Sequence, residues 1–192
     1  MRAAAIVGCV LLATVSGCSE SDPAAKPQAS GPCEAVVERS PAPAFALRDL
    51  AGHEVTLESL AGKTVVIDFW ATWCPPCEFQ IPVLNAVHDA WRERGVVVLG
   101  VAVDAEGIEK VGPYVAEHEV RYPILLGDEA LARKFGAVGF PSSVLIAPDG
   151  TMTKAHAGLL EQADLDAQIA CLASPSGEPV APSEPDRDAA AS

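Results

Sequence analysis

The clearest pattern along the chain is a pair of nearly continuous apolar runs, TVVIDFW at residues 64–70 and VVVLGVAV at residues 96–103. Runs of this length, rich in β-branched residues, predict strands that are buried on both faces of a sheet. The residues between them read as a long helix, which Pro75 opens and which extends to about Arg94. This strand–helix–strand order indicates an α/β sheet.

Shorter segments on either side complete a predicted α/β domain. Residues 45–48 and 54–57 flank a turn near Gly52, and so predict a β-hairpin ahead of the first buried strand. The later pattern predicts helices at 107–118, 129–135 and 161–172, a strand at 122–126, and a strand pair at 143–147 and 152–155 around Pro148-Asp149-Gly150. We therefore expect a central mixed sheet with helices on both faces.

The two ends of the chain lack this periodicity and predict segments outside the domain. Residues 1–17 carry one basic residue, then an apolar run too short to span a bilayer as a helix, then small residues, which is the plan of a secretory signal peptide. Residues 18–32 and 174–192 are rich in Ser, Pro and Ala, so we expect a flexible tether and a disordered acidic tail. The predicted domain spans residues 33–173.

The segment Val15-Ser16-Gly17-Cys18 resembles the bacterial lipobox, in which small residues precede a cysteine that is lipidated and becomes the new N-terminus. A cysteine at the end of the apolar run favours this interpretation over a plain signal peptide with an incidental cysteine. The hypothesis is a domain outside the cytoplasm, anchored by a lipid on Cys18 to the periplasmic side of a bacterial membrane or to the cell surface.

The charge of the chain argues against one class of partner. The formal net charge is −13, and residues 33–173 hold 20 acidic residues against 10 basic ones. Nucleic-acid affinity depends largely on Lys and Arg side chains that neutralise phosphates, so we expect no nucleic-acid binding. The ordinary interpretation of such acidity is solubility.

Six cysteines carry the candidate chemistry, and their positions separate them into different roles. Removal of the leader and modification of Cys18 would leave four, an even number of the kind expected where disulfides persist. Two of the four form the motif Cys74-Pro75-Pro76-Cys77, and the other two, Cys33 and Cys171, stand at opposite ends of the predicted domain.

The Cys74-Pro75-Pro76-Cys77 motif lies where the first buried strand ends and the long helix begins, and redox chemistry suits that place. A thiolate is the nucleophile in disulfide exchange, and a helix N-terminus stabilises negative charge. Cys74 is therefore predicted to attack, and Cys77 to resolve the mixed disulfide. The alternatives are a structural disulfide or half of a zinc site, but zinc needs two further ligands and no second CxxC or HxxxH is present. We expect no metal and no cofactor.

Three stretches of sequence carry a resemblance to a known family. They are DFWATWCPPC at 68–77, the lead-in LRDLAGHEVTLESLAGKTVVI before it, and VGFPSSVLIAPDG at 138–150. Together they resemble the TlpA/ResA-like branch of extracytoplasmic thioredoxin-like proteins, over a match from about Phe45 to Leu172. The resemblance implies a thioredoxin fold with an added N-terminal β-hairpin, and membrane-tethered reduction of disulfides in client proteins, often during cytochrome c or copper-site maturation. It also implies a DsbD/CcdA-like membrane protein as electron donor.

The resemblance assigns roles to three positions around the motif. Asp68 matches an aspartate of thioredoxins that is implicated in proton transfer with the deeper cysteine, and burial between its apolar neighbours would raise its pKa; a surface-edge residue is the alternative. ResA-like reductases carry a glutamate three residues after the second cysteine, where this chain has Gln80, a neutral amide that cannot act as a base. Gly139-Phe140-Pro141 matches the family's cis-proline loop, in which the backbone before the proline pairs with the substrate strand.

Three further residues are less specific. Trp73 precedes Cys74 and could shape the substrate face, although a packing role fits equally well. Cys33 and Cys171 resemble the extra cysteine pair of some TlpA-like proteins, which ties the N-terminal segment to the last helix. Two unpaired exported thiols are the alternative.

The two prolines of the motif favour reduction over oxidation of clients. Pro75 and Pro76 lack backbone N–H groups that could otherwise stabilise the Cys74 thiolate. A less stabilised thiolate gives a more reducing couple, nearer to thioredoxin at about −270 mV than to DsbA at about −120 mV. A disulfide-forming oxidase and a peroxidase of related fold remain as rivals, although the threonine-containing peroxidase motif is absent. A copper-carrying module would need a CxxxC motif and a distant histidine, and the spacing is wrong for it.

Overall fold

The computed structural model of the 192-residue chain describes residue 33 and residues 36–173. Nine strands lie within these residues: Arg39–Pro41 (β1), Ala46–Asp49 (β2), Glu54–Thr56 (β3), Thr64–Trp70 (β4), Val96–Ala102 (β5), Ile124–Leu126 (β6), Ser142–Ile146 (β7), Thr151–Thr153 (β8) and His156–Ala157 (β9). They form one sheet in the order β1-β8-β7-β4-β5-β6-β2-β3, with β9 paired to β7.

The two apolar runs form the centre of this sheet. β4 and β5 pair in parallel along their whole length, from Thr64 opposite Val96 to Trp70 opposite Ala102. β7 pairs with the other edge of β4 in the antiparallel direction, so the sheet is mixed. All seven residues of β4 are buried, as a strand with neighbours on both sides and helices over its faces requires. The predicted pair of buried strands and the mixed sheet are confirmed.

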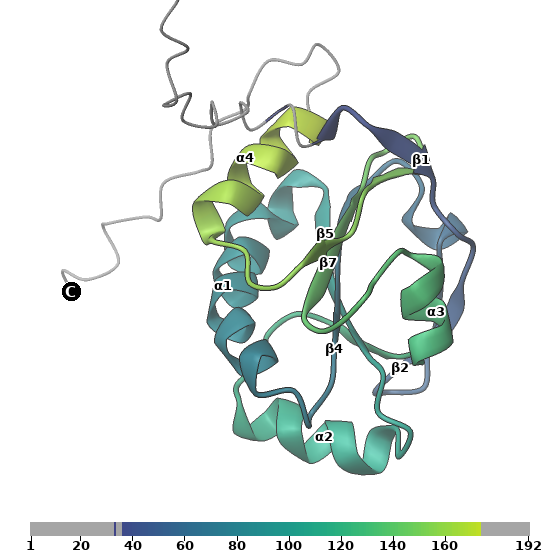
Figure 1. The fold of residues 1–192 in the computed structure, drawn as a ribbon, viewed down its shortest axis with the longest axis vertical. Coiled ribbons are helices and arrows are strands. Elements are labelled where there is room, and N and C mark those ends of the chain that lie inside the picture. The colour runs from purple at the N-terminus through teal and green to yellow at the C-terminus, as the bar shows by residue number, and fades with distance from the viewer. Residues whose placement is uncertain (1–32, 34–35, 174–192) are drawn as a thin grey trace, which may run out of the picture.

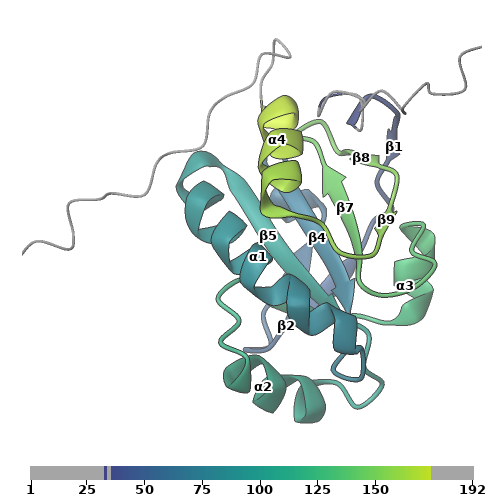
Figure 2. The ribbon, with the colours of Figure 1, turned by 60° about the vertical axis from the view of Figure 1, so that its left-hand side comes forward.

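Helices cover both faces of the sheet, as the sequence predicts. They are Pro75–Trp91 (α1), Ile108–Glu117 (α2), Glu129–Lys134 (α3) and Gln162–Ala173 (α4), with short 3₁₀ helices at Glu58–Leu60 and Arg92–Arg94. Figure 1 shows α1 and α4 on one side of the strands and α3 on the other, while α2 lies across one end. Figure 2 shows α1 and α4 packed side by side over β4 and β5. The first turn of α1 lies at the end of the molecule that α2 covers.

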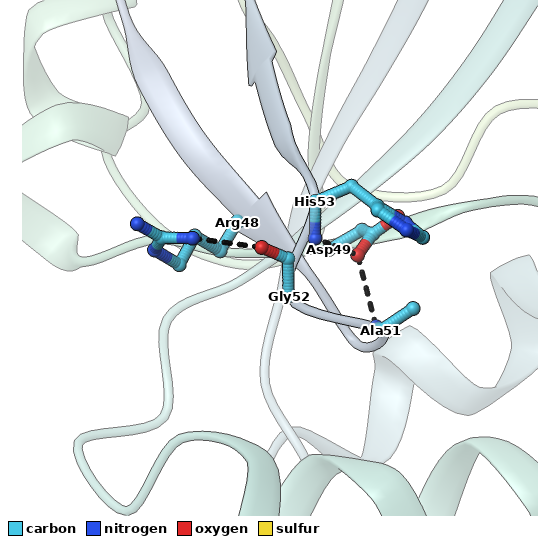
Figure 3. A network of polar contacts seen from close by, with 5 residues as sticks. All are labelled: Arg48, Asp49, Ala51, Gly52 and His53. Atoms are coloured by element: carbon cyan, nitrogen blue, oxygen red, sulfur yellow. Dashed lines mark hydrogen bonds and ion pairs between the residues drawn. The ribbon is translucent and has the colours of Figure 1, made fainter.

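The predicted N-terminal hairpin is formed by β2 and β3, which pair from Ala46 opposite Thr56 to Arg48 opposite Glu54. Figure 3 shows how its turn is held. The Asp49 carboxylate accepts hydrogen bonds from the backbone N–H groups of Ala51 at 2.9 Å and His53 at 2.8 Å. Gly52 adopts φ +86°, a conformation that side chains disfavour, and its carbonyl accepts from Arg48 at 2.7 Å. The hairpin extends the sheet by pairing β2 with β6.

Two strands of the structure are not predicted by the sequence pattern. β1 joins the edge of the sheet by pairing Arg39 with Thr153, and all of its residues are exposed. β9 is two residues long and also exposed. An exposed edge strand needs no alternation of apolar and polar residues, because neither of its faces is buried against the core. Proline is tolerated in β1 for the same reason, since an edge strand leaves one row of N–H groups unpaired.

Candidate active site

The two cysteines of the motif stand at the junction of β4 and α1. Cys74 is the residue that caps α1, with φ −104° and ψ 93°, and the two prolines that follow occupy the first helical positions. Proline suits these positions because the first N–H groups of a helix have no partner within it. Cys74 and Cys77 are joined by a disulfide with an S–S distance of 2.05 Å. Cys74 is 5% exposed and Cys77 is 2% exposed, so Cys74 is the more accessible of the two.

The loop that leads into Cys74 is held by a carboxylate from the neighbouring strand. Asp104, which is buried and follows β5, accepts the backbone N–H of Thr72 at 3.1 and 3.2 Å and its hydroxyl at 2.6 Å. The sequence reasoning missed this contact. A signal for it existed, because β4 and β5 are both buried strands, and parallel strands bring the residues after their carboxyl ends together.

Asp68 lies inside β4 and is 1% exposed. Its carboxylate accepts a hydrogen bond from the hydroxyl of Ser143, on β7, at 2.9 Å. Desolvation by burial raises the pKa of Asp68 to about 7, while the Ser143 hydrogen bond acts in the opposite direction. Asp68 is therefore a buried carboxyl group that changes its protonation state near neutral pH, and not a residue at the surface of the sheet.

The loop before β7 lies against the loop of the cysteines. The peptide bond between Phe140 and Pro141 is cis. The ring of Phe140 meets the ring of Trp73 edge to face, with 5.8 Å between the ring centres. Trp73 itself is 56% exposed, so it forms part of the surface next to Cys74 and is not buried in the core.

A hollow of about 510 Å³ lies next to this pair of rings. It is lined by small residues, including the buried Ala132 and Ala137, by the ring of Phe140, and by the charged Glu129 and Arg133. Val138, which is 89% exposed, also lines it. The exposed ring of Trp73 and the neighbouring ring of Phe140 give the site an apolar surface on which a polypeptide could lie.

The remaining predicted site residues lie elsewhere. Cys33 and Cys171 are joined by a disulfide, with their Cα atoms 5.5 Å apart, at the end of α4. Figure 1 shows the end of α4 beside the start of the described N-terminal segment, at the end of the molecule remote from α2 and from the first turn of α1. Cys18 lies outside the described residues, as do the predicted signal peptide, most of the tether and the acidic tail.

Two further observations concern only the part of the chain that the structure describes. Within residue 33 and residues 36–173, no three His, Cys, Asp or Glu side chains are grouped so that they could hold a metal ion. No helix of these residues is long and apolar enough to cross a membrane.

Known proteins that are similar to this chain in sequence include thiol-disulfide oxidoreductases. A family model described as "AhpC/TSA family" matches residues 39–155. The thiol-disulfide oxidoreductase ResA of Bacillus thuringiensis subsp. konkukian is 33% identical over 111 residues, which cover 57% of this chain and 63% of that protein, so the match spans less than two thirds of its length. The thiol-disulfide oxidoreductase ResA of Geobacillus thermodenitrificans is 31% identical over 132 residues, which cover 68% of this chain and 75% of that protein.

A solved structure is similar as well. The crystal structure of a thiol:disulfide interchange protein of the thioredoxin family from Chlorobium tepidum matches with a TM-score of 0.63 and 30% identity. The match covers 71% of this chain and 98% of that one.

Proposed function

We propose that this chain, which belongs to the AhpC/TSA family, is a protein-disulfide reductase that acts by thiol–disulfide exchange. Its fold is the thioredoxin-like fold that the sequence predicts, and the similarity to ResA proteins is confirmed. The observation that carries the proposal is the Cys74–Cys77 disulfide at the start of α1, next to the loop of the cis bond before Pro141.

The proposed reaction begins from the reduced pair. The Cys74 thiolate attacks one sulfur of a client disulfide, so that the client S–S bond breaks, a mixed disulfide forms and a client thiolate leaves. Cys77 then loses its proton and attacks the Cys74 sulfur, which releases the second client thiolate. The client gains two electrons, and the chain is left with the Cys74–Cys77 disulfide that the structure holds. A reductant must supply two electrons before the next cycle.

In this scheme Asp68 takes the proton of Cys77. It is the buried carboxyl group of β4, the strand that leads to the cysteines, and its pKa of about 7 lets it accept and release a proton at neutral pH. Gln80, three residues after Cys77, cannot replace it because a carboxamide does not take up a proton in this range. Phe140, Pro141 and Trp73 form the proposed client surface beside Cys74.

The direction of electron flow is proposed from the chemistry of the motif. Pro75 and Pro76 occupy the first two positions of α1 and lack the backbone N–H groups that could otherwise donate to the Cys74 thiolate. We propose a reducing couple that acts on clients such as apocytochrome c or copper-site proteins, and that is recharged by a DsbD/CcdA-like membrane protein. The proposed place is outside the cytoplasm, with a lipid on Cys18 as anchor.

Trapping of clients tests the proposal. Cys77→Ala should form a stable mixed disulfide through Cys74 with a disulfide-bearing protein, because the resolving thiol is missing. Cys74→Ala is the matched control, and should trap nothing because Cys77 lies one turn deeper in α1. Non-reducing electrophoresis and mass spectrometry identify the bond and the partner. Efficient trapping by Cys74→Ala with none by Cys77→Ala would refute the assigned roles.

The same preparation separates the rival functions. A reductase reduces insulin with dithiothreitol as electron source and has a potential closer to thioredoxin than to DsbA. A measured potential near that of DsbA would favour the oxidase. Rapid consumption of hydrogen peroxide by the reduced chain would favour the peroxidase.

A further inference from the structure

Gln80 makes a two-way contact between the helix of the cysteines and the loop that follows β9. Its side chain is 0% exposed. The Nε2 group donates to the carbonyl oxygen of Leu160 at 3.1 Å, and Oε1 accepts from the Leu160 N–H at 2.9 Å. A carboxamide can make both bonds because it carries a donor and an acceptor side by side. Since Gln80 lies one helical turn after Cys77, the contact fastens this loop to the beginning of α1.

The same loop is fastened at its other side to the cis-proline. The N–H of Gly158 donates to the carbonyl oxygen of Pro141 at 2.9 Å. Leu159, between the two fastened residues, is 50% exposed, whereas Leu160 is 7% exposed. Residues 158–160 therefore bridge from Pro141 to α1, and they leave one apolar side chain open to solvent along the way.

We propose that Gln80 is a positioning residue for client binding. Its carboxamide holds residues 158–160 against α1, and so places Leu159 on the surface that contacts a disulfide-bearing polypeptide. The inference rests on the proposed disulfide exchange, because that reaction is what makes the surface around Cys74 and Pro141 a client surface. Gln80 acts through Leu159 and not through proton transfer.

A carboxyl group at position 80 would make the contact depend on pH. An ionised carboxylate only accepts hydrogen bonds, so in Gln80→Glu one oxygen would face the Leu160 carbonyl without a proton between them. The protonated form has one O–H donor and one free acceptor, and restores both bonds. The variant should therefore keep the loop in place at low pH and release it as the carboxyl group ionises, a change that the wild-type amide cannot undergo.

The same helix offers a matched control. The Asn85 Nδ2 group donates to the carbonyl oxygen of Glu119 at 3.0 Å, and its Oδ1 accepts from the Arg121 N–H at 2.8 Å. Asn85 is 5% exposed and also ties α1 to a loop, but to the loop after α2. Asn85→Asp imposes the same chemical change on α1 without touching residues 158–160.

Steady-state kinetics with two substrates test the proposal. One is a disulfide-bonded peptide with apolar residues beside its cysteines. The other is glutathione disulfide, which has no apolar side chain beside its cysteines that could contact Leu159. Gln80→Ala should raise KM for the peptide about tenfold with little change in kcat, about the effect of losing one or two net hydrogen bonds. The rate with glutathione disulfide should stay the same. In Gln80→Glu, KM for the peptide should be raised at pH 8 but not at pH 5.5. In Asn85→Asp, KM for the peptide should be unchanged at both pH values.

Leu159 provides the second arm of the test. Leu159→Ala, a change at a half-exposed side chain, should raise KM for the peptide as Gln80→Ala does, and the double variant should show no further increase. Independent, additive effects of the two changes would overturn the proposal, and so would an unchanged peptide KM in Gln80→Glu at pH 8. A wild-type chain that reduces neither substrate would instead overturn the proposed function, so the two failures are distinguishable.

Discussion

Asp68 shows how the position of one residue in the sheet sets its chemistry. The side chain lies in the central strand β4, with β5 and β7 on either side, and is 1% exposed. An isolated carboxyl group in water would be ionised at neutral pH, but desolvation raises the pKa of Asp68 to about 7. The hydroxyl of Ser143 supplies a hydrogen bond that partly offsets this cost. A group with such a pKa is matched to proton transfer at neutral pH.

Asp68→Asn should slow the resolution of the mixed disulfide at neutral pH. The carboxylate accepts the Cys77 proton only when it is ionised, so the wild-type rate should rise with pH through about 7. The variant should lose that step in the pH profile while Cys74 still forms the mixed disulfide. Stopped-flow measurement of client release between pH 5.5 and 8.5 checks this. A variant with the wild-type rate at every pH would leave the two cysteines as the only catalysts.

Asp68→Asn should also change how the stability of the fold depends on pH. Between the unfolded pKa of about 4 and the folded pKa of about 7, the folded chain binds more protons at Asp68 than the unfolded chain does. The free energy of unfolding is therefore lowered as pH rises through this window, by about 4 kcal/mol in total if Asp68 acts alone. In Asp68→Asn, the free energy of unfolding should not show this part of the decline with rising pH. Urea unfolding at pH 4.5 and pH 8 measures the difference.

At the scale of elements, the N-terminal strand β1 is held in place by contacts with other segments and not by burial of its own side chains. Its residues are exposed, and it pairs with the short strand β8. An ion pair between Glu38 and Lys154 and a longer one of 3.9 Å between Arg39 and Asp149 join the same two segments. Exposed ion pairs of this kind contribute little stability. The Cys33–Cys171 disulfide, which links the segment before β1 to α4, adds a covalent constraint to the backbone pairing of this edge.

Removal of that disulfide should lower stability without abolishing activity. The bond joins residues 138 positions apart, and the loop-entropy relation gives about 4–5 kcal/mol for a loop of this size. Cys33→Ser with Cys171→Ser should therefore lower the midpoint of chemical unfolding, while Cys74 and Cys77 still reduce insulin. Reaction of native protein with a thiol-alkylating reagent under non-reducing conditions is the control. Alkylation of both wild-type cysteines would show that they are not bridged.

At the scale of the whole molecule, the described segment that follows the proposed tether and the proposed active site lie at opposite ends. Figure 1 shows the beginning of the described chain beside the end of α4, and the first turn of α1 beside α2 at the far end. A lipid on Cys18 would therefore hold the domain by the end remote from Cys74. The cysteines would then lie on the side of the domain that faces away from the anchor, where client proteins can reach them.

Cys18→Ala should release the protein from membranes into a soluble fraction outside the cytoplasm. The reason is that a lipid chain supplies apolar surface for membrane binding, whereas no helix of the described residues is long and apolar enough to span the bilayer. Fractionation of cells with detection of the chain in each fraction measures this. Wild-type protein found soluble, with an unmodified Cys18 in its mass spectrum, would contradict the anchor.

The sequence by itself determined the order of the elements and the place of the cysteine motif. The apolar runs at 64–70 and 96–103 predict strands that are buried on both faces of the sheet. The strands β4 and β5 have nearly the same bounds as these runs. The start of α1 and the hairpin turn are local features, set by Pro75 and Pro76 and by Gly52, so they can be predicted from a few neighbouring residues. The edge strands β1 and β9 were missed because an exposed edge imposes no pattern.

Only the tertiary structure decided which side chains surround the cysteines. The Thr72–Asp104, Asp68–Ser143 and Gln80–Leu160 contacts join residues 32, 75 and 80 positions apart. No pattern within a single segment encodes such pairs, because each depends on which strands and loops the sheet brings together. For Thr72–Asp104, the two neighbouring buried strands were the available signal. The raised pKa of Asp68 follows from its burial, and the contact at Leu160 follows from the two hydrogen bonds of Gln80. Both are properties of the packed molecule and not of any one segment.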